Sequence, residues 1–441
     1  MPTRMNKTII LREYQTLGYQ QGKCDAQISR KEWDEIRDYV QDNPDAEGRQ
    51  AMEVRAGTIR AANYVGVLQT SRGTTIEILP KVDLGQGKGQ GEEKGEDIER
   101  EREIFLRMLR RWRDGPCRNF NDADVRALKN FPLLEAFIGM FLRDMQELTR
   151  RGLACAYNEV EENRHTLKGK LLIAKNLRHN LIHRERFYVQ YQEFSANRPI
   201  NRLLKSTLLL LQRLSRSETN LWHIRQARLY FEDIPSSSNI DADLGRARVD
   251  RTMPLYDRLF PWARLFLKRA SPTTWKAANP ALALLFPMEK IFEDYVAHLV
   301  RIAAADKHWR VSTQESRYYL AEKKPDCKPE FQLRPDIVAR CGAGAQCKVR
   351  VMDSKWKRLN RDDKQHHYGI SQSDLYQMYA YGKKYRAPDL YLLYPRNENF
   401  RERLEYEYEP GLRLTIFPVD LREEKPLCEL FDQAGMTCKA A

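Results

Sequence analysis

Leu333-Arg-Pro-Asp-Ile-Val338 is followed, after a short gap, by Val349-Arg-Val-Met-Asp-Ser-Lys355. The gap contains glycines, which predicts a turn, so the two apolar runs are expected to pair as a hairpin. This pairing brings Asp336 and Asp353 to one end of a sheet. Because side chains alternate between the faces of a strand, Asp353 and Lys355 should point the same way and Ser354 the opposite way.

Two carboxylates beside one ammonium group are typical of a metal-dependent phosphodiesterase site. Mg²⁺ prefers oxygen ligands and is usually held by one or two carboxylates together with phosphate and water. A bound metal ion activates water, and a neighbouring lysine offsets negative charge as it develops. Taken alone, the pattern also fits a pair of acidic residues that flank a turn, which is common. The expectation for Asp336, Asp353 and Lys355 therefore depends on what surrounds them.

A third acidic residue is expected from a helix at residues 288–304, which begins after Pro287. Glu293 lies at the margin of its apolar stripe, where a carboxylate can reach a buried site. Glu289 falls inside the same stripe and is the rival candidate. The alternative for either residue is a solvated position at the rim of the helix.

A second helix is expected from Ser371 to Arg386, with Ser371 and Asp374 as a capping-box-like start. Gln377 and Tyr381 are one turn apart on it and share a face. Such a pair can hydrogen-bond a phosphate or brace Lys355, although it is more often part of a polar helix surface.

The composition favours a polyanionic partner and disfavours a membrane protein. The 441 residues are 42% hydrophobic, and 75 Lys and Arg against 61 Asp and Glu give a net charge of +14. A basic excess of this size suits nucleic acid. No apolar run approaches the length of a membrane span. The chain also lacks the sequence Gly-x-x-x-x-Gly-Lys-[Ser/Thr], so any nucleotide hydrolysis is expected from another chain.

The eight cysteines are scattered without a Cys-x-x-Cys pair, which favours reduced thiols and a cytoplasmic location. A zinc site formed by Cys341 and Cys347 with His366 and His367 is disfavoured by its irregular spacing. The adjacent histidines in a polar loop also argue against a histidine-based nuclease.

The predicted organisation is α+β with three parts. Residues 1–97 are expected to be β-rich, with a hairpin around residues 71–73, one buried face on the strand 74–79, and a mobile glycine-rich loop at 85–97. Residues 98–280 are expected to be mainly helical, with strong helices at 132–151 and 199–214. Residues 281–441 are expected to form an α/β core.

These residues resemble two nested families. Pro335-Asp336, Asp353-Ser-Lys355 and the upstream Phe292-Glu293 resemble the PD-(D/E)xK nuclease superfamily, and Gln377-x-x-x-Tyr381 is similar to its RecB-like branch. Several further blocks, in order, resemble the McrC family: Tyr64-Val-Gly-Val-Leu68, Ile76-Glu-Ile-Leu-Pro-Lys81, Arg151-Gly-Leu153, Tyr157, Leu167-Lys-Gly-Lys170, Asn197-Arg198, Met288-Glu-Lys-Ile-Phe-Glu-Asp-Tyr-Val296, Leu333-Arg-Pro-Asp-Ile337 and Asp374-Leu-Tyr-Gln-Met-Tyr-Ala380.

The resemblance implies the nuclease subunit of a restriction system that acts on 5-methylcytosine in double-stranded DNA. The implied partner is an McrB-like AAA+ GTPase hexamer, which binds the GTP and recognises the modified base. The N-terminal domain would enter the ring and stimulate GTP hydrolysis, and the 85–97 stretch looks like an insertion. The implied site consists of Asp336, Asp353, Lys355, Glu293, Gln377 and Tyr381, with Mg²⁺ held by Asp336, Asp353 and Glu293.

Two other classes of function stay open at this point. One is a non-catalytic DNA-binding adaptor that regulates an AAA+ partner. The other is a stand-alone nuclease, or one that is paired with an ATPase.

Overall fold

The computed structural model describes residues 7–20, 22–42, 50–82, 93–117, 122–249, 253–269, 282–342 and 347–431. Contacts divide the chain into two compact units, Met1–Asn130 with Leu285–Ala441, and Phe131–Leu284. In the part that the structure describes, no helix has the length and apolar character needed to cross a bilayer.

The first unit begins with two four-stranded sheets, ordered β1-β7-β6-β11 and β3-β2-β5-β4. The predicted hairpin is confirmed, because β6 and β7 pair in antiparallel fashion and Gly73 takes a positive φ of 91° in the turn. The elements of this part are β1 (Thr8–Arg12), β2 (Thr16–Gly18), β3 (Ala26–Gln27), α1 (Arg30–Asp42), β4 (Met52–Arg55), β5 (Thr58–Ala61), β6 (Tyr64–Gln69), β7 (Thr75–Leu79), α2 (Glu93–Arg111), α3 (Asp122–Leu128) and β11 (Leu282–Pro287).

Helix α2 corrects three of the expectations for this region. It packs on β7, so that strand is buried on both faces rather than one. Glu77 is fully buried there and lies 2.7 Å from Arg102 of α2. The expected loop at 85–97 ends early, because α2 already begins at Glu93; residues 85–92 lie outside the described part. The expected domain boundary at 97/98 therefore falls inside a helix, and α2 and α3 belong to the first unit.

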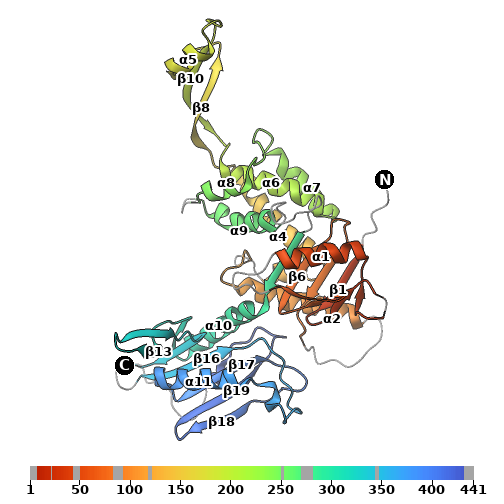
Figure 1. Ribbon diagram of the computed structural model, residues 1–441, viewed down its shortest axis with the longest axis vertical. Coiled ribbons are helices and arrows are strands. Elements are labelled where there is room, and N and C mark those ends of the chain that lie inside the picture. The colour runs from red at the N-terminus through yellow and green to blue at the C-terminus, as the bar shows by residue number, and fades with distance from the viewer. Residues whose placement is uncertain are drawn as a thin grey trace. The chain divides into compact units, whose positions relative to one another are not determined.

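The rest of the first unit is built on a six-stranded sheet ordered β12-β15-β16-β17-β19-β18. Helix α11 packs on one face of it, with Met378 and Tyr381 in a shared core with Val351 and Leu392 (Figure 1). Helix α10 contacts β12 and β16. The elements are α10 (Met288–Asp306), β12 (Arg310–Thr313), β13 (Tyr319–Lys323), β14 (Lys328–Gln332), β15 (Ile337–Cys341), β16 (Lys348–Ser354), η3 (His367–Gly369), α11 (Gln372–Tyr385), β17 (Asp389–Pro395), β18 (Leu404–Glu409), β19 (Leu412–Val419) and η4 (Cys428–Leu430).

The second unit contains the two strong helices that the sequence predicts, α4 (Leu133–Arg151) and α6 (Pro199–Leu214). Gly152 ends α4 with a φ of 89°, and Pro199 occupies the first turn of α6, as these residue types favour. The remaining helices are α5 (Ile173–His179), α7 (Glu218–Leu229), α8 (Ile240–Arg246) and α9 (Pro254–Arg269).

The expectation that the middle region is mainly helical is wrong for residues 156–195. There β8 (Ala156–Arg164), β10 (Phe187–Ser195) and β9 (Lys170–Leu171) form a three-stranded sheet. Burial alternates strictly along β8, but its sequence Ala156-Tyr-Asn-Glu-Val-Glu-Glu-Asn-Arg164 does not alternate apolar with polar residues, so it carries no clear period-two signal. In Figure 1 this ribbon and α5 extend away from the helices of their own unit.

Candidate active site

Asp336 and Asp353 lie at adjacent strand ends, as the sequence predicts. Strands β15 and β16 pair in antiparallel fashion with Ile337 opposite Met352. The next position along places Asp336 opposite Asp353. Asp353 is 2% exposed. The hairpin therefore brings both carboxylates together at the end of β16.

Ser354 holds the carboxylate of Asp336 in place. Its backbone N–H and its hydroxyl both donate to Asp336 Oδ2 at 2.8 Å. These bonds connect the residue after Asp353 directly to the other acid of the pair. The residue between Asp353 and Lys355 is thus a positioning residue, a role that the sequence did not reveal.

Lys355 is directed at Asp353, as expected for residues i and i+2 of a strand. Its Nζ lies 2.7 Å from Asp353 Oδ2. The predicted bracing helix is also in place, because Gln377 Oε1 accepts from Lys355 Nζ at 3.4 Å, and Gln377 Nε2 donates to Tyr381 Oη at 2.7 Å. Helix α11 therefore fixes the ammonium group through Gln377, and Tyr381 fixes Gln377.

Asp374 has a different role from the one predicted. Ser371 is the N-cap of α11 but makes no capping hydrogen bond, so the capping-box start is wrong. The Asp374 carboxylate instead lies 3.9 Å from Lys355 Nζ and accepts from Tyr394 Oη at 3.4 Å. Asp374 therefore adds a negative charge near Lys355. Local sequence rules had assigned this residue to the capping of the helix instead.

Glu293, and not its rival Glu289, belongs to this site. Glu289 Oε1 accepts from Asn63 Nδ2 at 2.9 Å. Glu293 is partly buried and accepts from Gln314 Nε2, which also donates to Asp336 Oδ1 at 3.1 Å. The side-chain amide of Gln314 therefore links the two acids. Gln314 has a φ of 51°, a left-handed conformation that costs a non-glycine residue energy and occurs often at functional sites.

The cluster contains more acidic side chains than the single positive charge of Lys355 can balance. Burial and then the charge of Asp336 raise the pKa of Asp353 to about 7. Burial and then the charge of Glu293 raise the pKa of Asp336 to about 6. Burial by itself lowers the pKa of Lys355, but the neighbouring acids, Asp353 first and then Asp374 and Asp336, together raise it. Strongly shifted carboxyl groups in contact with a lysine mark this cluster as a candidate functional site.

The donor set fits a hard divalent cation held by two carboxylates. Within the described ranges, no three or more His, Cys, Asp or Glu side chains are arranged to hold a metal ion. The expected ligand set of Glu293, Asp336 and Asp353 is therefore not assembled as a closed site, because the Gln314 amide lies between Glu293 and Asp336. Asp336 and Asp353 still offer the one or two carboxylates that Mg²⁺ usually takes, and a cation would relieve their mutual repulsion.

The zinc alternative gains no support. His366 is exposed and lies 2.8 Å from Asp363 Oδ1. Cys347 is a free thiol, but Cys341 is disulfide-bonded. The expectation of reduced thiols is wrong at Cys341, because the spacing of cysteines does not reveal which of them meet in the fold.

Replacing Gln314 tests whether the amide between the two acids matters. Gln314→Ala leaves Glu293 and Asp336 without a shared donor. If this cluster cuts DNA, as the resemblance implies, the variant should slow cleavage about 10- to 100-fold, as for residues that orient metal ligands. Cleavage rate in the presence of Mg²⁺ measures this. Gln332→Ala is the control, because that amide donates to Ser316 O at 2.9 Å and not to the acids. Equal rates for the two variants would contradict the role of Gln314.

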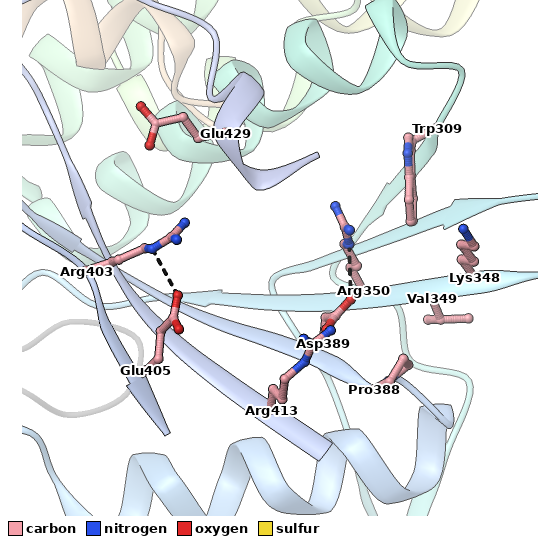
Figure 2. A pocket seen from close by; sticks show the side chains of 10 residues that line it. All are labelled: Trp309, Lys348, Val349, Arg350, Pro388, Asp389, Arg403, Glu405, Arg413 and Glu429. Atoms are coloured by element: carbon pink, nitrogen blue, oxygen red, sulfur yellow. Dashed lines mark hydrogen bonds and ion pairs between the residues drawn. The ribbon is translucent and has the colours of Figure 1, made fainter. Parts of the chain in front are cut away.

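A pocket of about 710 Å³ lies where β16 and β17 begin, at the opposite end of these strands from Asp353 and Lys355 (Figure 2). Lys348 and Arg350 near the start of β16 line it, together with Asp389, the first residue of β17. Asp389 lies 3.5 Å from Arg350 Nε and 2.8 Å from Arg413 Nη2. The negative charge of Asp389 is thus balanced by two arginines, whereas Asp336 and Asp353 share one lysine. Asp389 therefore offers a matched control for these two acids.

Known proteins were compared with the chain by sequence and by fold. No curated protein matches the chain. The fold is similar to a chain in the half-complex from the tetradecameric assembly of Thermococcus gammatolerans McrB AAA+ hexamers with bound McrC, with a TM-score of 0.67 and 22% identity over 94% of this chain and 95% of that one. A chain of the Thermococcus gammatolerans McrBC complex gives a TM-score of 0.48 at 22% identity, over 67% and 88% of the two chains.

A family model covers most of the sequence. Residues 59–395 match the McrBC 5-methylcytosine restriction system component model. This range includes Glu293, Asp336, Asp353, Lys355, Gln377 and Tyr381. Because the match spans well over half of the 441 residues, the chain belongs to the McrBC 5-methylcytosine restriction system component family.

Proposed function

We propose that this chain is the DNA endonuclease subunit of a modification-dependent restriction complex and that it hydrolyses phosphodiester bonds with Mg²⁺. The observation that carries the proposal is the ion pair of 2.7 Å between Lys355 and Asp353, set beside a second aspartate on the neighbouring strand. Membership of the family supplies the restriction context. The reaction itself rests on the residues of the cluster and their resemblance to PD-(D/E)xK nucleases.

Each residue of the cluster has a proposed task. Asp336 and Asp353 would hold Mg²⁺, which when bound supplies an activated water molecule and charge stabilisation at phosphorus. Lys355 faces Asp353 and offsets the negative charge that develops on the phosphate oxygens. Gln377 and Tyr381 keep Lys355 in position, and Glu293 acts as a helper through Gln314.

We propose that an AAA+ GTPase of the McrB type is the partner, and that it provides nucleotide hydrolysis and recognition of 5-methylcytosine. The similar chain comes from an assembly of McrB AAA+ hexamers with bound McrC. The described part of the chain also offers a surface for a protein partner. On and beside α5, apolar side chains are 61% (Leu177), 70% (Leu181) and 87% (Ile182) exposed, and they are the residues that we propose for such a contact. This surface supplements the predicted contact through residues 1–97.

The proposal predicts a specific dependence on metal and pH. Mg²⁺ binds carboxylates only after they lose their protons. Since the pKa of Asp336 is about 6 and that of Asp353 about 7, protons and Mg²⁺ compete below pH 7. With the partner and GTP present, we expect plasmid cleavage at limiting Mg²⁺ to fall from pH 8 to pH 6, and excess Mg²⁺ to restore it. EDTA should abolish it.

Three outcomes separate the alternatives. Cleavage that persists in EDTA would contradict a metal-dependent site. No cleavage at any pH or Mg²⁺ concentration, with intact stimulation of the partner GTPase, would identify a non-catalytic adaptor instead. Cleavage that is as fast without the partner, or faster with ATP than with GTP, would favour a stand-alone nuclease or an ATPase partner.

A further inference from the structure

Trp356 directly follows Lys355 and is tied to a residue 343 positions away. The side chain is 8% exposed, and its indole Nε1–H donates to both carboxylate oxygens of Glu13, at 2.9 and 3.1 Å. The indole ring also packs on Phe292, with ring centroids 5.3 Å apart. Phe292 precedes Glu293 on α10, so Trp356 is next to two residues of the proposed site.

Glu13 is held rigidly by the N-terminal sheet. It follows β1, is 1% exposed, and its backbone N–H donates to Leu79 O at 3.1 Å. The backbone N–H of Lys81 donates to its carboxylate at 3.1 Å. A buried carboxylate is costly unless its acceptors are satisfied. The sheet and Trp356 satisfy them here, and burial still raises the pKa of Glu13 to about 7.

A second link joins the same two parts of this unit. Asn63, between β5 and β6, accepts from the backbone N–H of Met288 at 2.9 Å, and its side chain donates to Glu289 at 2.9 Å. Both contacts fix the first turn of α10, one turn before Glu293. The N-terminal sheet therefore holds α10 and the segment after β16 at once.

We propose that Glu13 is a positioning residue of the cleavage site, which acts through Trp356 to fix Lys355 and the Phe292–Glu293 turn. This rests on the proposed nuclease function and deepens it. The buried contact makes the geometry of the site depend on the N-terminal sheet. A movement of β1 and β7 would displace Lys355 through the contact between Glu13 and Trp356. A partner that binds the N-terminal part could therefore change the geometry of the site.

The test compares matched variants of the full chain with the partner, GTP and Mg²⁺ on supercoiled plasmid. We expect Glu13→Ala to lower kcat about 10- to 100-fold with little change in KM, since a small misplacement of a reacting group has effects of this order. Glu13→Gln keeps one acceptor for the indole N–H and should recover most of the rate. Glu32→Gln is the control, because that buried acid bonds Ser29 and Thr70 instead.

Trp356→Phe provides a second variant, because it keeps an aromatic ring against Phe292 and removes only the N–H donor. If Glu13 acts through Trp356, the Glu13→Ala/Trp356→Phe double variant should be no slower than the slower single variant. Losses that multiply would overturn the proposal. So would a Glu13→Ala rate equal to that of Glu32→Gln, or a loss confined to KM.

A readout without cleavage separates this proposal from the nuclease function. In the full chain labelled with 5-fluorotryptophan, the ¹⁹F signal that Trp356→Phe removes should shift with pH around 7 in the wild type. This shift should be clearly smaller in Glu13→Gln, where Asp336 and Asp353 still titrate in this range but the partner of the indole N–H does not. The charged groups nearest to Glu13, Lys81 and Glu289, remain in both proteins. A wild type that does not cut overturns the nuclease function. A wild type that cuts, with unchanged Glu13 variants, overturns only the positioning role.

Discussion

Asp353→Asn should abolish DNA cleavage while leaving the fold and the partner contacts intact. The change is nearly isosteric but removes a charge that is 2% exposed and lies 2.7 Å from Lys355 Nζ. It takes away a proposed metal ligand and the counter-charge of the lysine at once. We expect cleavage to fall by about 10³-fold or more, equivalent to about 4 kcal/mol of transition-state stabilisation.

Asp389→Asn is the matched control for this prediction. Asp389 is an acid on β17 of the same sheet, but it is paired with Arg350 and Arg413 at the opposite strand ends. Cleavage of supercoiled plasmid and stimulation of the partner GTPase are measured for both variants. Asp353→Asn should lose only cleavage, and Asp389→Asn should retain both activities. An Asp353→Asn protein that still cuts DNA would show that the site is elsewhere.

Lys355→Met should produce the second-largest loss, about 10²-fold in cleavage rate, as for the removal of one group that stabilises developing charge. Methionine has a similar length but no charge. Lys355 lowers the pKa of Asp353, so its loss should leave that carboxyl protonated at still higher pH. The remaining activity should therefore need a more alkaline pH than the wild type, which a pH profile at fixed Mg²⁺ measures.

Lys357→Met controls for the loss of one positive charge in this segment. Lys357 is exposed and lies two residues beyond Lys355, outside the acidic cluster. Removing it should change the affinity for DNA at most, and not the pH profile. Lys355→Arg should rescue little, because a planar guanidinium does not replace a compact ammonium group. Equal pH profiles for the Lys355→Met protein and the wild type would contradict contact with Asp353.

Local sequence patterns predicted much of the core of the site. The alternation of side chains placed Lys355 beside Asp353, and the glycine-containing turn predicted the pairing of β15 with β16. The helical spacing of Gln377 and Tyr381 predicted their shared face. Each of these is a relation between residues that are close in sequence or joined by one turn, and backbone geometry fixes it before distant packing matters.

The contacts that local patterns missed depend on distant segments. The choice of Glu293 over Glu289 was settled by Gln314 and Asn63, which come from a strand end and from the N-terminal part. The β8–β10 ribbon lies between strong helices, and β8 is mostly polar without apolar–polar alternation, so no local pattern indicates a strand there. The position of α2 on β7 explains why Glu77 is buried, which no local pattern indicates.

The sequence by itself determined the family, the placement of Lys355 beside Asp353, and the elements that carry these residues, because they follow from residue type and short-range spacing. Only the tertiary structure decided which side chains each acid contacts. It placed Gln314 between Glu293 and Asp336, turned Ser354 onto Asp336, brought Asp374 to Lys355, and joined Glu13 to Trp356. The physical reason is that buried charges must find partners wherever the fold provides them, and those partners come from any part of the chain.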